Sequence, residues 1–125
     1  MLIWNRRLWM RLGVVNALCS VVVALLAFRL HDDSAANLLR LGAGFQFMHS
    51  LSTFSCATFM NVGASEARHA PALFLLGSAM FSGSLYARAC GVWDGGELAL
   101  GIGAALMAGG WGVLFVASGG IDRDA

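Results

Sequence analysis

The sequence predicts an all-α integral membrane protein, a bundle of four antiparallel transmembrane helices within one domain spanning residues 1–125. Hydrophobic residues make up 58% of the chain and charged residues 12%, about half the charged fraction of a typical soluble domain. Apolar segments recur four times, and between Leu12 and Ser118 the charges fall almost entirely in the short gaps between them. Each segment approaches the roughly 20 apolar residues that a helix needs to cross a bilayer.

The first transmembrane helix is expected at residues 12–28, preceded by Arg6, Arg7 and Arg11. Basic residues before an apolar run also begin a signal peptide, but this run is longer than a typical signal-peptide core, and no A-x-A cleavage site follows it. We therefore interpret the segment as a retained helix. Arginine side chains at its ends can lengthen the span by reaching toward the interface.

The other helices are expected at residues 41–62, 71–87 and 98–118. Asp33 or Ser34 is the expected N-cap before the second helix, because short polar side chains accept the free amide hydrogens there. Pro71 suits the first turn of the third helix, where a missing amide hydrogen costs nothing. The short loops between the segments predict antiparallel neighbours.

All eight basic residues are arginines, and their distribution predicts the orientation. With both termini in the cytoplasm, five arginines lie inside and three outside. Cytoplasmic loops carry an excess of basic residues, so this orientation is favoured. The inside set is Arg6, Arg7, Arg11, Arg68 and Arg123, and the outside set is Arg29, Arg40 and Arg88.

Small residues recur every fourth position in the last two spans and predict helix packing. Lipid supplies no hydrophobic drive between helices, so close backbone approach through small residues supplies van der Waals contact instead. Trp111 lies inside the last span, where a packing role is expected. The sequence leaves open whether the partner is a helix of this chain, a second copy in a homo-oligomer, or another membrane protein. The two stripes are Ala79, Gly83 and Ala87, and Gly101, Ala105 and Gly109.

Gln46, His49 and Ser50 are the candidate polar site inside the membrane. The three-residue spacing of Gln46 and His49 places them on one helix face, and ionisable groups at membrane depth usually face the protein interior. They could fix helix register by hydrogen bonding, line a path for a proton or small solute, or bind a metal. His31 and His69 are expected at opposite membrane faces, so the three histidines cannot share one ion. We expect no metal and no cofactor.

Other chemistries find little support in the sequence. A net charge of +1 without a basic stripe argues against nucleic-acid binding. The three cysteines are too scattered for a disulfide framework or a zinc site. Ser82 and Ser84 flank Gly83 but lack the strand-turn-helix context of a nucleophile elbow. Tyr86 is expected at the membrane interface. We therefore expect the protein not to be an enzyme.

Three sequence blocks resemble a known family. Residues 81–86 read F-S-G-S-L-Y, residues 45–51 are similar to Y-Q-x-x-H-A/T-L, and a Gly-Trp pair begins at residue 110. Together these blocks resemble the domain-of-unknown-function 423 family, small bacterial inner-membrane proteins related to animal transmembrane protein 256. Two family features are absent: the glycines that end the first helix, at residues 26–31, and a Thr-Pro pair, replaced by Leu100-Gly101.

The resemblance implies a four-helix protein of the bacterial inner membrane and brings no established activity, but it places Gln46 and His49 on a family motif. A structural or accessory membrane protein, with the lipid bilayer as its surroundings, is the favoured hypothesis. The alternative is a component that transports a proton or small solute along Gln46 and His49. Proton-coupled carriers usually bury a carboxylate, and none of the seven acidic residues lies in an expected span.

Overall fold

The structure, a computed structural model, describes residues 5–94 and 96–123. These residues form four long α-helices and one short 3-10 helix, with no strand among them, which confirms the all-α class. The elements are α1 (Arg6–Ala27), α2 (Asp33–Asn61), η1 (Ser65–His69), α3 (Ala70–Ala89) and α4 (Glu97–Ser118).

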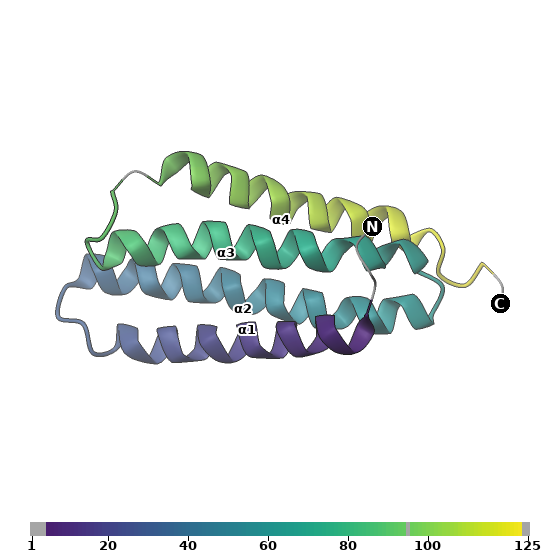
Figure 1. Cartoon of the computed structure of the whole chain (residues 1–125), viewed down its shortest axis with the longest axis horizontal. Coiled ribbons are helices and arrows are strands. Elements are labelled where there is room, and N and C mark those ends of the chain that lie inside the picture. Colours follow the sequence, from purple (N-terminus) through teal and green to yellow (C-terminus); the bar gives the residue numbers. More distant parts are fainter. Residues whose placement is uncertain (1–4, 95, 124–125) are drawn as a thin grey trace.

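The four helices lie side by side in chain order, each running opposite to the one before it (Figure 1). α2 packs against α1 and α3, and α4 packs against α3 and η1. α2 and α3 are therefore the inner helices, while α1 and α4 stand at opposite edges of the row. An end of the row, in contrast to an edge, is an end along the helix axes. Because the number of helices is even, the start of α1 and the end of α4 lie at the same end of the row (Figure 1).

α2 begins earlier than the sequence predicts. Its N-cap is Asp32, whose side chain accepts hydrogen bonds from the backbone amides of Ser34 and Ala35 at 2.8 and 3.3 Å. The expected cap, Asp33 or Ser34, is therefore wrong by one or two residues, because the first of the three adjacent polar residues takes the role. Pro71 lies in the first turn of α3, as expected.

Three segments are long and apolar enough to cross a membrane: Arg6–Ala27, Ser65–Ala89 and Glu97–Ser118. The sequence predicts four such spans, and α2 is not among the three found. Its composition gives the reason: Gln46 and His49 are followed by four hydroxyl-bearing residues before Cys56. α2 is the longest of the four helices, yet it is the least apolar along its middle.

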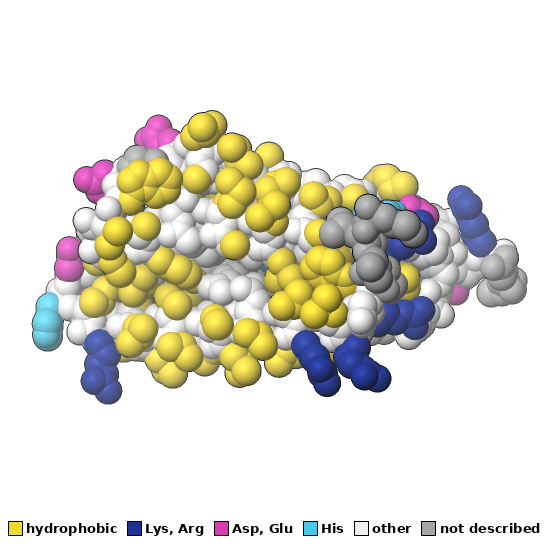
Figure 2. All heavy atoms as spheres, viewed as in Figure 1, with side chains coloured by type: hydrophobic (Ala, Val, Ile, Leu, Met, Phe, Trp, Pro, Cys, Tyr) yellow, Lys and Arg dark blue, Asp and Glu magenta, His cyan; other side chains and the backbone are white. Residues whose placement is uncertain are grey.

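The distribution of side chains is the reverse of that in a soluble protein. Large hydrophobic side chains are exposed along the helices, whereas much of the interior consists of alanine, serine and threonine. Figure 2 shows hydrophobic side chains over the middle of one face and charged side chains toward its two ends. Soluble domains bury their large apolar residues, so this pattern is the one expected of helices surrounded by lipid.

The close contact between α3 and α4 is made by glycines outside the predicted stripes. A Cβ atom on Gly103 would lie 2.7 Å from the Phe81 nitrogen and 2.8 Å from the Gly77 oxygen. Near the other end of the contact, a Cβ atom on Gly110 would lie 2.5 Å from the ring of Phe74. The two backbones approach this closely only because these side chains are absent.

The predicted stripes face outward instead. Ala79 and Gly83 on α3 and all three stripe residues of α4 are exposed, and Ala87 is half-buried. A Cβ atom on Gly83 or Gly101 would meet nothing within 4 Å. Packing within the chain therefore uses the opposite face of α4, and a role for the stripes in contacts with another molecule stays a prediction. The stripe residues of α4 are Gly101, Ala105 and Gly109.

We predict that Gly103→Ala destabilises the protein and that Gly101→Ala does not. The new methyl group at residue 103 meets backbone atoms that cannot move aside, so the helices must separate at a cost of about 1–3 kcal/mol. At residue 101 the space is open, and alanine raises helix propensity by up to about 1 kcal/mol. Thermal unfolding of both variants in detergent measures the difference. Equal midpoints would contradict the assigned α3–α4 contact.

Candidate functional site

Gln46, at the centre of α2, connects three helices through its side-chain amide. Its Nε2 donates to Oδ1 of Asn16 on α1 at 2.8 Å and to the Asn16 carbonyl oxygen at 3.2 Å. Its Oε1 accepts a hydrogen bond from the Tyr86 hydroxyl on α3 at 2.6 Å. One side chain thus holds α1 on one side of α2 and α3 on the other.

Ser50 closes a ring of hydrogen bonds with Gln46 and Asn16. The Asn16 Nδ2 donates to the Ser50 Oγ at 2.7 Å, and the Ser50 Oγ donates to the Gln46 carbonyl oxygen at 2.7 Å. The ring lies where α1 comes close to α2, since a Cβ atom on Gly13 would be 3.2 Å from the Ser50 carbonyl oxygen. A buried polar group without a partner destabilises the fold strongly, and here the side-chain groups of all three residues have one.

His49 uses both of its ring nitrogens. Nδ1 lies 2.7 Å from the Phe45 carbonyl oxygen, which can only accept, so Nδ1 carries the hydrogen. Nε2 accepts a hydrogen bond from the indole Nε1 of Trp111 on α4 at 3.2 Å. These partners assign the neutral tautomer with hydrogen on Nδ1. A second proton on Nε2 would face the Trp111 N–H and break the contact between α2 and α4.

Aromatic rings surround His49, which is 3% exposed. The ring centroids of Phe74 and Trp111 lie 5.5 and 6.1 Å from that of His49, and they lie 5.2 Å from each other in an edge-to-face arrangement. Phe45 stacks one turn before the histidine at 6.2 Å. Gly110 leaves the space that the Phe74 ring occupies against α4. The imidazole is therefore held in one orientation by packing as well as by hydrogen bonds.

The structure brings together Gln46, His49, Ser50 and Trp111, and it adds Tyr86 to them. The hydroxyl of Tyr86 points to Gln46, and a Cβ atom on Gly42 would lie 2.5 Å from the Tyr86 ring. The hydroxyl therefore finds its partner inside the protein, while the interfacial depth of Tyr86 stays a prediction. Together, the side chains of Asn16, Gln46, His49, Ser50, Tyr86 and Trp111 form the polar core. The stripe residues take no part in it; they are Ala79, Ala87, Gly83, Gly101, Ala105 and Gly109.

Sequence reasoning also missed Asn16 and the role of Ser82. Asn16 is the only side-chain amide in residues 12–28, which was the available signal. The Ser82 Oγ donates to the Gly42 carbonyl oxygen at 2.7 Å and adds a second link between α2 and α3. The F-S-G-S-L-Y block thus supplies two hydrogen-bond donors to α2, one from Ser82 and one from Tyr86.

The remaining histidines lie far from this core. His31 is in the loop between α1 and α2, and His69 ends η1 at the opposite end of the row, where it lies 3.3 Å from Glu66. Within residues 5–94 and 96–123, no three His, Cys, Asp or Glu side chains are grouped so that they could hold a metal ion. The arrangement around His49 instead offers hydrogen bonds between helices.

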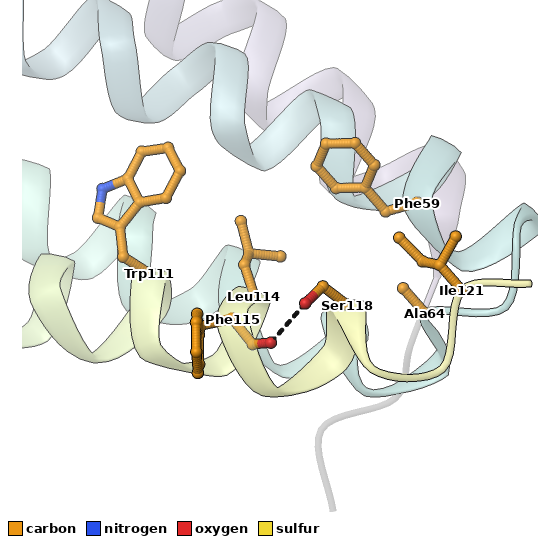
Figure 3. Close-up of a pocket in the computed structure, with 7 residues that line it drawn as sticks. All are labelled: Phe59, Ala64, Trp111, Leu114, Phe115, Ser118 and Ile121. Atoms are coloured by element: carbon orange, nitrogen blue, oxygen red, sulfur yellow. Dashed lines mark hydrogen bonds between the residues drawn. The ribbon is translucent and has the colours of Figure 1, made fainter.

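An apolar groove of about 410 Å³ lies between α2, the turn that follows it and α4. Figure 3 shows Trp111 at one end of this groove and Phe59 with Ile121 at the other. The ring of Trp111 lines the groove, and its Nε1 donates a hydrogen bond to His49. Trp111 therefore belongs both to the groove and to the hydrogen-bonded polar core. The remaining lining residues are Ala64, Leu114, Phe115 and Ser118.

Comparison with known proteins gives one match. A model of the family described as "Protein of unknown function (DUF423)" matches residues 22–110, more than half of the chain. No curated protein and no solved structure matches. Gln46, His49 and Tyr86 lie within the matched range, whereas Asn16 and Trp111 lie outside it.

We predict that His49→Ala lowers the stability of the detergent-solubilised protein by about 1–3 kcal/mol, because the Trp111 N–H loses its acceptor and a cavity opens among the rings. His31→Ala is the matched control, since His31 is exposed in a loop. The thermal unfolding midpoint of each variant measures the effect. An unchanged midpoint together with a loss of proton flux in liposomes would contradict the structural role and favour transport.

Proposed function

This chain belongs to the DUF423 family of unknown function, and we propose that it is a structural or accessory protein of the bacterial inner membrane, neither an enzyme nor a carrier. The polar core supports this proposal most directly. The side chains of Gln46, His49 and Ser50 form hydrogen bonds with Asn16, Tyr86, Trp111 and the backbone of their own helix. Such bonds between helices fix register and are worth about 1 kcal/mol each in membranes.

The antiparallel row supports four membrane crossings. α1 and α3 are two of the three candidate spans, and they run in the same direction (Figure 1). If both cross the bilayer, α2 has to bring the chain back across it. The neighbours of α2 cover its polar residues, which explains how a helix of low hydropathy can stand at this depth.

The alternative function is a proton or small-solute path that uses Gln46 and His49. Such a path needs a histidine that can exchange protons with water or with a carboxylate. His49 is enclosed by aromatic rings, and its Nε2 would have to release Trp111 before accepting a proton. The geometry therefore supports the structural role better than transport.

The arginines support a cytoplasmic position for both termini. Arg6, Arg7 and Arg11 at the start of α1 share one end of the row with Arg68 of η1 and Arg123 after α4. The three other arginines lie toward the opposite end, together with Asp32, Asp33, Asp94 and Glu97. The more basic end is the one that stays in the cytoplasm.

We predict that alkaline phosphatase fused to the C-terminus is inactive in a bacterial host, because the enzyme needs disulfides that form only in the periplasm. A fluorescent-protein fusion at the same position should be bright. Alkaline phosphatase inserted after Asp94, between α3 and α4, should be active and is the matched control. An active C-terminal fusion would reverse the proposed orientation.

The outward small-residue face of α4 supports association with another helix, and we propose a second copy of this chain as its partner. Gly101 and Ala105 are exposed on an edge helix whose opposite face already packs on α3 through Gly103. Small side chains allow a second helix to approach closely, as Gly103 and Gly77 already allow within the chain. Contact between copies would place two such α4 faces against each other.

We predict that the double variant Gly101→Leu and Ala105→Leu shifts the protein from oligomer to monomer in mild detergent. The added side chains enter open space in the monomer, so its thermal unfolding midpoint should not fall. Gly44→Leu on α2 is the matched control, since a Cβ atom there also meets nothing within 4 Å. Light scattering coupled to size exclusion measures the mass, and an unchanged mass for the double variant would contradict this contact.

A further inference from the structure

An apolar groove of about 560 Å³ between α1 and α2 has two arginines at one end. Arg7 and Arg11 are one helical turn apart on α1, and the apolar lining residues from α1 continue along the same face away from them. Phe54 of α2 forms the opposite wall. The other lining residues are Met10, Val14 and Val15.

Neither guanidinium group has a hydrogen-bond or ion-pair partner within the described part of the chain. Arg7 and Arg11 are exposed, and no hydrogen bond or ion pair joins their guanidinium groups to residues 5–94 or 96–123. Two other arginines of this end differ: Arg6 donates to the Asn61 side chain at 2.7 Å, and Arg68 lies 3.8 Å from Glu66. Two adjacent guanidinium groups present ten N–H donors with no acceptor, which suits a phosphate group.

We propose that this groove binds an anionic phospholipid. The phosphate lies between the guanidinium groups of Arg7 and Arg11, and an acyl chain follows Met10, Val14 and Phe54 into the bilayer. The inference rests on the proposed membrane location, which places these arginines at the interface and the apolar residues at the depth of the lipid tails. A phospholipid suits the groove because its charged head matches the two free cations and its apolar tail matches the apolar channel.

The charge of the two arginines also selects among lipids. A zwitterionic headgroup brings its own cationic amine close to the phosphate, where a second guanidinium repels it. An anionic headgroup such as phosphatidylglycerol brings no cation, so it gains from both arginines. Each arginine near an anionic membrane contributes roughly a fivefold gain in binding.

A second groove between α1 and α2 provides the comparison. It contains Arg40, but this guanidinium is already engaged: it lies 5.5 Å over the Phe28 ring and donates to the Asn37 side chain at 3.1 Å. One engaged cation gives weaker selection for an anionic headgroup than two free ones. Arg40, with Arg29, therefore supplies a control of equal charge at the other end of the row.

The test is native mass spectrometry of the full chain with phosphatidylglycerol and phosphatidylcholine of identical acyl chains. We expect the wild type to retain phosphatidylglycerol in preference, and R7Q/R11Q to lose roughly 25-fold of that preference. The control R29Q/R40Q removes the same charge and should keep it. Equal losses in the two double variants, or no loss in R7Q/R11Q, would overturn the site.

A further variant separates the groove from simple attraction of a phosphate. Val15→Trp fills the apolar channel and leaves both arginines, so it should weaken phosphatidylglycerol binding, and inorganic phosphate should not displace the lipid from the wild type. Displacement by phosphate would show an anion site without an acyl-chain groove and would overturn the proposal.

Extraction with alkaline carbonate distinguishes the two levels of inference. If the wild type leaves the membrane under these conditions, the proposed membrane function fails. If it stays in the membrane but shows no preference for phosphatidylglycerol, the lipid site alone fails.

Discussion

The requirement that a polar group away from water finds its partner inside the protein organises this structure. α2 carries the polar side chains, and each helix around it supplies what they need: Asn16 from α1, Tyr86 from α3 and Trp111 from α4. A buried amide or imidazole without these partners would destabilise the fold by an amount comparable to its desolvation. The order and register of the helices therefore depend on hydrogen bonds that a sliding helix would break.

Glycine contacts complete what the hydrogen bonds begin. The polar core ties α3 to α2, whereas α4 packs mainly on α3 and η1 and bonds α2 through the long side chain of Trp111. Gly77 and Gly103 let those two backbones meet, and Gly110 lets the Phe74 ring lie beneath Trp111 and against His49. The close approach of α3 and α4 thus positions the indole that bonds the histidine. Loss of the glycine contact between α3 and α4 would loosen the Trp111–His49 hydrogen bond, and loss of that hydrogen bond would loosen the glycine contact.

The outer surfaces differ in character because the row has two edges. The α4 edge presents small residues over open space, which suits a helix from another molecule. The α1 edge presents free arginines beside an apolar groove, which suits a lipid. Both proposals concern faces that the chain leaves uncovered, whereas its polar interior is already satisfied. In this interpretation, the interior of the protein maintains shape and its outer faces carry the interactions with other molecules.

Long apolar runs separated by charged gaps were enough to predict the four helices, and helical periodicity placed Gln46, His49 and Ser50 on one face. Which faces of the helices meet became clear only from their packing. Gly101 and Gly103 look alike in sequence, yet one faces open space and the other a backbone 2.7 Å away. Asn16 and Tyr86 likewise became partners of Gln46 only when the helices were placed. Helical spacing predicts which residues share a face, but the hydrogen bonds that join α2 to its neighbours link residues 30 to 62 positions apart.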